Sequence, residues 1–174
     1  GIQQAHEIDK EQLETTILKL LETTLNQLLE MRLREGQQTG QQVQEKCLKI
    51  QDYVAAAAKR MPEVLTQIRT RLIERVNELV SSPDPDRLEQ ELVLLANKLD
   101  VTEELERLET HITEVIRVLN QNEPVGRRLD FLMQELNREA NTLGSKSADK
   151  EITQIAIELK VLIEQMREQI QNIE

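Results

Sequence analysis

The chain has 174 residues and a formal net charge of −10, and 39% of its residues are hydrophobic but only 1% are aromatic. The negative charge excludes a protein that holds nucleic acid through its overall field, because phosphate contacts draw on Lys and Arg. So few aromatic residues, with five Gly and four Pro, disfavour a β-rich fold and favour an all-α one.

The first part of the chain predicts a long amphipathic helix. Apolar residues recur at three- and four-residue steps from Leu13 to Leu33, which predicts a helix over residues 9–34. Gly36 and Gly40 mark the end of this helix or a kink in it, because glycine is a poor helix former.

A second long helix is expected over residues 42–80. Pro62 lacks an N–H and clashes with the preceding turn, so we expect a kink or a break at residues 60–61. Cys47 lies among apolar residues of this helix and is the only cysteine, so it is read as a buried structural thiol that forms no intramolecular disulfide.

The second half of the chain predicts shorter helices separated by clear breaks. The segment 81–86 is the clearest loop, and Asp86 is the expected N-cap of the next helix. Residues 100–103 have the spacing of a capping box. The helices are expected over residues 86–99, 100–119, 125–143 and 152–173, with a loop at 144–149. We expect them to pack as antiparallel hairpins or a bundle that oligomerisation completes, because thin apolar stripes bury little surface within one chain.

Four residues with chemistry share one face if residues 89–111 form one helix. Glu89, Asp100 and His111 are eleven residues apart, so they recur within about 20° of one another, with Glu104 about 40° further round. Carboxylates with a neutral imidazole suit Mg²⁺ or Mn²⁺. We therefore predict that these four residues bind metal and that Glu104 and His111 are catalytic. In the alternative, Asp100 caps a helix and the neighbouring glutamates are solvated.

A second cluster lies in residues 126–146. Glu135 and Glu139 are four residues apart on a predicted helix, a like-charge pair that is repulsive unless a cation intervenes. We predict that both carboxylates are catalytic. The alternative is a set of intrahelical ion pairs such as Glu135 with Arg138. The basic residues of this segment that could reach phosphate are Arg127, Arg128, Arg138 and Lys146.

Several of these segments carry a resemblance to a known family. The sequences GRRLDFLMQELNRE (126–139), NTLGSKS (141–147) and ELKVLIEQMREQIQNIE (158–174) closely resemble the C-terminal signature of the bacterial YicC/YloC family. The sequence RLEQELVLLANKLDVTEELERLETH (87–111) is also similar to that family. The resemblance implies a metal-dependent endoribonuclease, using Mn²⁺ or Mg²⁺, that cuts single-stranded RNA.

The resemblance also bears on organisation. It implies an additional N-terminal domain ahead of this region in whole members, and ring-like homo-oligomers, trimer-based and hexameric at full length. We therefore expect a C-terminal piece with a long helical hairpin region at 1–82 and a family-signature helical domain at 83–174. A cytoplasmic location is expected, since no run approaches the roughly 18 apolar residues of a membrane span.

Contacts with RNA are expected from the C-terminal basic residues and from one basic stretch that holds Arg60, Arg69 and Arg71. Tyr53 and Phe131 are the only aromatic residues, so base stacking is not expected to be the main source of affinity. We predict a metal-dependent endoribonuclease domain. The alternative is a non-catalytic helical scaffold for oligomerisation or RNA binding, with the acidic stripe and the basic stretch merely solvated.

Overall fold

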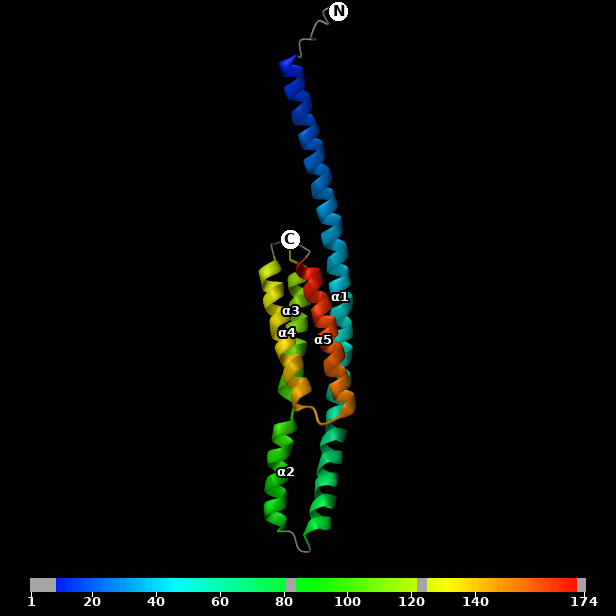
Figure 1. Ribbon diagram of the computed structural model, residues 1–174, viewed down its shortest axis with the longest axis vertical. Coiled ribbons are helices and arrows are strands. Elements are labelled where there is room, and N and C mark those ends of the chain that lie inside the picture. Colours follow the sequence, from blue (N-terminus) through cyan, green and yellow to red (C-terminus); the bar gives the residue numbers. More distant parts are fainter. Residues whose placement is uncertain (1–8, 81–83, 122–124, 172–174) are drawn as a thin grey trace, which may run out of the picture. The chain divides into compact units, whose positions relative to one another are not determined.

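The computed structural model describes residues 9–80, 84–121 and 125–171. The helices in these ranges are α1 (Lys10–Leu79), α2 (Pro85–Leu99), α3 (Thr102–Leu119), α4 (Gly126–Lys146) and α5 (Lys150–Gln171) (Figure 1). The same ranges contain no strand, so the prediction of an all-α fold is confirmed. None of the described helices is long and apolar enough to cross a membrane.

Helix α1 is continuous where the sequence predicted an end or a kink at the glycines. A Cβ placed on Gly36 or Gly40 would meet nothing within 4 Å, and no glycine among the described residues has a positive φ. Both glycines therefore fit an ordinary helix, at a cost of about 1 kcal/mol each relative to alanine. The prediction of two helices in this region was wrong, because this cost is too small to end a long helix.

The sequence predicted a kink or a break at residues 60–61; Pro62 lies inside α1, so the break does not occur. Proline removes one backbone hydrogen bond from the helix. The residues beside it, Met61 and Val64, are buried in the core on both sides of the proline. This packing holds the helix together across the position.

Aspartate side chains cap two of the shorter helices. The N-cap of α2 is Asp84, whose carboxylate accepts hydrogen bonds from the backbone N–H groups of Asp86 and Arg87. The prediction of Asp86 was wrong by two residues, because Pro85 already takes the first helical position, which suits proline. At the start of α5, Asp149 Oδ1 accepts from the N–H groups of residues 151 and 152, both at 3.1 Å.

The chain divides into two compact units, residues 1–39 and 40–174. In the described part of the first unit, α1 carries the apolar stripe that the sequence predicted. Its members are all exposed: Leu13, Ile17, Leu20, Leu21, Leu25, Leu28, Leu29 and Leu33. An amphipathic helix that leaves its apolar stripe in water is typical of a surface that another chain covers.

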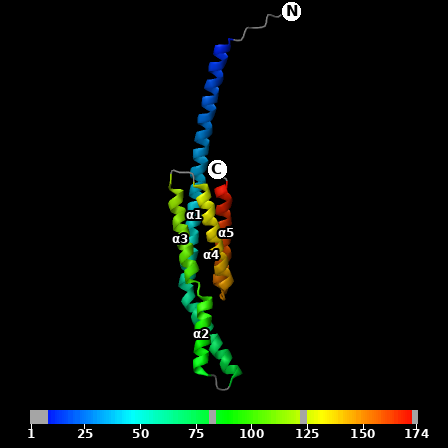
Figure 2. The same cartoon turned by 90° about the vertical axis from the view of Figure 1, so that its left-hand side faces the viewer.

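In the second unit, residues 43–64 of α1 pack with α3, α4 and α5 around one core (Figures 1 and 2). The largest fully buried side chains come from all four helices: Ile50, Leu108, Ile112, Leu129, Met133, Leu136, Leu143, Ile152, Leu159, Ile163 and Met166. Cys47 lies in this core with no exposed surface, as predicted for a structural thiol. The core therefore draws on both sequence regions, 1–82 and 83–174, and the compact units divide near residue 40.

Helix α2 runs beside the C-terminal part of α1 (Figure 2). An open cavity of about 560 Å³ lies between them, lined mostly by apolar side chains such as Leu72, Val76, Leu88 and Leu95. Apolar side chains such as these cannot bind a metal ion or transfer a proton. The candidate site lies instead between α3 and α4.

Candidate metal centre

The candidate site is built on the antiparallel packing of α3 against α4. Glu104, near the start of α3, pairs with Lys146 at the end of α4, whereas Glu114, further along α3, pairs with Arg128 near the start of α4. Leu108 and Leu136 are fully buried, one in each helix. This apolar packing sets the register of the polar side chains.

A line of polar residues runs along this contact, which we call the polar seam. On α3 the seam residues are spaced by three, four and three positions, so they fall on one helix face. The four opposed pairs, written with the α3 residue first, are Glu104–Lys146, Arg107–Glu139, His111–Glu135 and Glu114–Arg128. Both outer pairs and the inner pair Arg107–Glu139 are ion pairs, and the two inner pairs together hold the histidine and the two glutamates.

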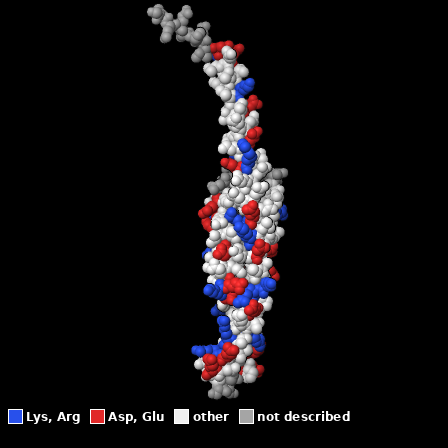
Figure 3. Space-filling model, turned by 90° about the vertical axis from the view of Figure 1, so that its right-hand side faces the viewer, with Lys and Arg blue, Asp and Glu red and all other residues white. Residues whose placement is uncertain are grey.

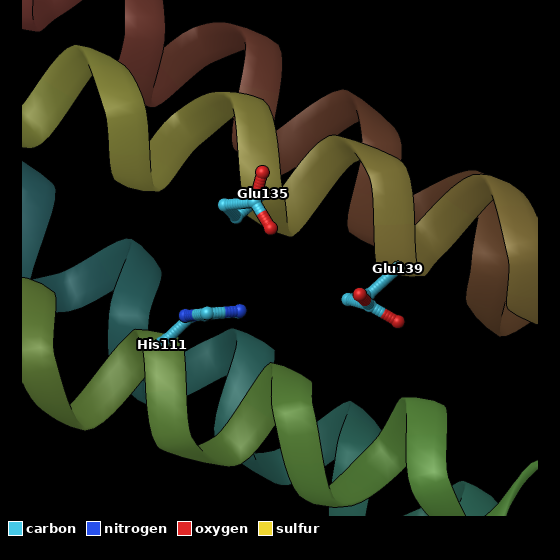
Figure 4. Close-up of side chains that lie close together, drawn as sticks. All are labelled: His111, Glu135 and Glu139. Carbon is cyan, nitrogen blue, oxygen red and sulfur yellow. The ribbon is translucent and has the colours of Figure 1, made fainter.

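The centre of the polar seam is a cluster of His111, Glu135 and Glu139. One possible ligand atom from each residue lies within 4.8 Å of the others. The three side chains point toward one another, His111 from α3 and the two glutamates from successive turns of α4 (Figure 4). His111 and Glu135 are half-buried and Glu139 is buried, with 4% of its side chain exposed. The cluster is therefore a partly enclosed set of one imidazole and two carboxylates.

This donor set fits a divalent cation. Two glutamates four residues apart on a helix repel each other, and burial of Glu139 increases the cost of leaving its charge unbalanced. A cation between them removes the repulsion. Oxygen donors suit Mg²⁺ and Mn²⁺, and a single imidazole favours Mn²⁺.

The metal set predicted from the sequence is not brought together. The helix that would have aligned Glu89, Asp100 and His111 is interrupted, because α2 ends at Leu99 and α3 begins at Thr102. Glu89 is exposed on α2 and pairs with Arg69 of α1 at 2.8 Å. Among the described residues, His111 instead clusters with Glu135 and Glu139, both of which the sequence had singled out as catalytic.

Asp100 lies at the junction of two helices: it is the C-cap of α2, and the N-cap of α3 is Val101, so the alternative of Asp100 as the N-cap of α3 is not borne out either. Its Oδ1 accepts hydrogen bonds from the Thr102 hydroxyl at 2.6 Å and from the Thr102 N–H at 2.9 Å. These hydrogen bonds lower the pKa of Asp100. Its backbone oxygen accepts from Lys146 Nζ at 3.2 Å, which ties the α2–α3 junction to the end of α4.

Glu104 lies two turns before His111 on the same face of α3. It is buried and forms an ion pair with Lys146 at 2.7 Å, while its second oxygen, Oε2, is buried without a hydrogen-bond partner among the described residues. The separation from His111 makes Glu104 a neighbour of the cluster rather than part of it.

Five of the seven basic residues predicted to contact RNA form ion pairs. The pairs are Arg60–Asp149, Arg69–Glu89, Arg128–Glu114, Arg138–Glu135 and Lys146–Glu104. Arg71 and Arg127 are exposed and have no such partner in the described ranges. On the face shown in Figure 3, Lys and Arg lie interleaved with Asp and Glu.

Sequence reasoning missed the role of Arg107. Its Nη1 lies 3.5 Å from Glu139 Oε1, and its Nη2 donates to Glu103. Arg107 precedes His111 by one turn, so their shared face was visible in the sequence. Its pairing with Glu139 was not, because that depends on the register of α3 against α4.

Comparison with known proteins identifies the family. Residues 57–174, more than half of the chain, match the family described as "Endoribonuclease YicC-like, C-terminal". The chain belongs to this family. All residues of the cluster lie in the matched part.

Two bacterial relatives agree with this assignment. A protein of Haemophilus influenzae named "Probable endoribonuclease YicC" is 45% identical over 174 residues, which is all of this chain and 61% of the relative. A protein of Clostridioides difficile with the same name is 37% identical over 171 residues, 97% of this chain and 58% of the relative. The chain thus spans about three fifths of these curated relatives.

Proposed function

We propose that this chain is the metal-dependent catalytic part of an endoribonuclease that cleaves phosphodiester bonds in single-stranded RNA. The cluster of His111, Glu135 and Glu139 carries the proposal. It is the kind of site that phosphodiester cleavage uses, and it lies in a chain whose relatives are named probable endoribonucleases.

The cluster residues would hold the ion, Mn²⁺ or Mg²⁺. When bound, such an ion supplies Lewis-acid stabilisation of the charge that develops on the phosphate. Helix packing fixes the buried Glu139, whereas the half-buried His111 and Glu135 border the open side of the cluster. Arg138 is exposed and lies 4.0 Å from Glu135, so its guanidinium is placed to orient the RNA backbone.

Single-stranded RNA is favoured by one exposed aromatic residue. Phe131 is 57% exposed and lies one turn before Glu135 on α4. A base stacks on such a ring only when it is unpaired, and each stacked base contributes about 1–3 kcal/mol. Phe131→Leu should therefore weaken binding of single-stranded RNA and leave duplex binding unchanged, as measured by fluorescence anisotropy.

The proposal is tested by incubating an end-labelled single-stranded RNA with the chain in Mn²⁺ or in EDTA. We expect cleavage in Mn²⁺ alone, and its loss in His111→Ala, Glu135→Gln and Glu139→Gln. Glu164→Gln is the matched control, because Glu164 is an exposed glutamate that pairs with Arg167 on α5. Folded protein that shows no cleavage under any of these conditions would favour the non-catalytic scaffold.

Self-association is proposed on a separate observation, the exposed apolar stripe from Leu13 to Leu33. A second copy would cover this stripe, in line with the trimer-based or hexameric assembly that the family resemblance implies. Light scattering of the purified chain should give a mass of at least twice 20.2 kDa. A mass of one chain at micromolar concentration would contradict self-association.

The cytoplasm remains the expected location.

A further inference from the structure

Arg107 occupies an unusual position between a buried and an exposed carboxylate. Its side chain is 50% exposed, and it reaches Glu139 with one nitrogen and Glu103 with another. Glu139 belongs to the candidate cluster, whereas Glu103 lies one turn before Arg107 on the exposed face of α3. The guanidinium therefore bridges the cluster and the solvent.

A guanidinium at this position competes with a metal ion. Both are cations, and both are attracted to the carboxylate of Glu139. In the described part of the chain, Arg107 is the basic residue paired with Glu139, at 3.5 Å. That contact is long for a hydrogen bond, so Arg107 balances the charge of Glu139 without holding it firmly. When a metal ion binds Glu139, the guanidinium still has Glu103 as a partner.

We propose that Arg107 is a positioning residue that occupies Glu139 in the metal-free protein and turns to the RNA phosphate once a metal ion holds Glu139. This inference rests on the proposed function. It assigns Arg107 two effects of opposite sign: the residue weakens metal binding in the absence of RNA, and it strengthens RNA binding in the presence of metal. A guanidinium suits the second task, because its planar fork matches two phosphate oxygens.

The neighbouring cations do not have this arrangement. Arg138 lies 4.0 Å from Glu135 and is 70% exposed, so it is free to bind phosphate without first leaving a buried ligand. Arg117 also lies on α3 and pairs with Glu114, outside the cluster. Arg117 thus provides a control that removes one positive charge from the same helix.

The test measures two affinities on the 174-residue chain. The first is the affinity for Mn²⁺ without RNA, from the electron paramagnetic resonance signal of free Mn²⁺. In wild type, Mn²⁺ binds only when the Arg107 guanidinium has left Glu139, which lowers the apparent affinity. Arg107→Gln removes this competition, so we expect it to bind Mn²⁺ about three- to tenfold more tightly. Arg117→Gln should stay within about twofold of wild type, because charges in solvent act weakly at a distance.

The second affinity is for a 2′-O-methylated single-stranded RNA, measured in saturating Mn²⁺. Methylation blocks attack by the 2′ oxygen, and a gel run after the measurement checks that the RNA has not been hydrolysed. We expect Arg107→Gln to bind it about fivefold more weakly, as for the loss of one hydrogen bond to phosphate. Arg107→Lys should restore most of this loss, since lysine also binds phosphate. A residue that only supports the fold would lower both affinities together and would lower the melting temperature.

The outcomes separate the two proposals. If wild type binds Mn²⁺ and Arg107→Gln binds it equally or more weakly, the inference about Arg107 is overturned while the metal site stands. Tighter Mn²⁺ binding with unchanged RNA affinity also overturns it. If the wild-type chain binds no Mn²⁺, the proposed metal site fails first. Should Arg107→Gln not fold, Arg107→Met, which also removes the positive charge and keeps a long side chain, gives the same comparison.

Discussion

Replacing Glu139 by glutamine should have little effect on the metal-free protein. The substitution removes repulsion with Glu135, which is worth about 0.2–0.5 kcal/mol for an i,i+4 pair. It also removes the charge-assisted contact with Arg107, which is long and half-exposed and is worth at most about 1 kcal/mol. The two changes have opposite signs. We therefore expect Glu139→Gln to melt in EDTA within about 3 °C of wild type.

The same variant should behave differently in Mn²⁺. At a concentration 100 times its Kd, a ligand that binds only the folded state stabilises it by about 2.7 kcal/mol. For a chain of this size, 1 kcal/mol shifts the melting temperature by about 2–4 °C, so wild type should gain about 5–10 °C. Glu139→Gln loses a charged ligand and should lose most of this gain.

Thermal melts followed by circular dichroism give the melting temperatures of wild type and Glu139→Gln, each in EDTA and in 1 mM Mn²⁺. Glu164→Gln should keep the full gain, because its carboxylate lies outside the cluster. The reasoning would be refuted by a gain in Glu139→Gln equal to that of wild type. A large loss of stability in EDTA would show instead that Glu139 is held by its contact with Arg107, and that the cluster is structural.

Three further predictions follow from single contacts. Asp100→Ala should lose about 1 kcal/mol in EDTA and in Mn²⁺ alike, because its carboxylate accepts two hydrogen bonds from Thr102 at the start of α3; a loss seen only in Mn²⁺ would show instead that Asp100 is a metal ligand. Burial raises the pKa of Cys47 to about 12, so iodoacetamide at pH 8 should label it only in denaturant, and rapid labelling of folded protein would contradict the burial. The hydrogen bond from Arg60 lowers the pKa of Asp149 below its ordinary value of 3.8, so this stabilisation is present above that pH and is lost as the pH falls through the lowered pKa. Arg60→Gln should therefore lower the melting temperature at pH 7, and its difference from wild type should shrink as the pH falls below 3.8. A difference that does not change with pH would argue against the pair.

The helical periodicity predicted where most elements lie, and its errors have physical causes. Glycine and proline were read as signals that end a helix, but a local penalty of a few kcal/mol or less is outweighed when packing continues on both sides. Pro62 shows this, with Met61 and Val64 both buried. Gly36 and Gly40 lie where nothing crowds the backbone, so nothing there forces a turn.

For the candidate site, the sequence supplied the residues but not their partners. His111 was assigned to a stripe on one helix, because helical phase is all that a sequence provides directly. The like-charged pair Glu135 and Glu139 was predicted to be repulsive unless a cation intervenes. The histidine faces this pair because of the register in which α3 packs against α4. That register is set by the buried side chains between the helices, among them Leu108 and Leu136.

A site shared by two helices also constrains which insertions and deletions the chain tolerates. The junction between α3 and α4 can change in length without moving a ligand, provided that the two helices keep their packing. One residue inserted within α4 before Glu135 would rotate both glutamates by about 100° relative to the part of the helix that precedes it. An insertion of seven residues would restore the phase to within about 20° but displace the glutamates by about 10 Å along the helix axis. Length variation among relatives should therefore concentrate at the junction between the two helices and be absent between His111 and Leu119 and between Gly126 and Glu139.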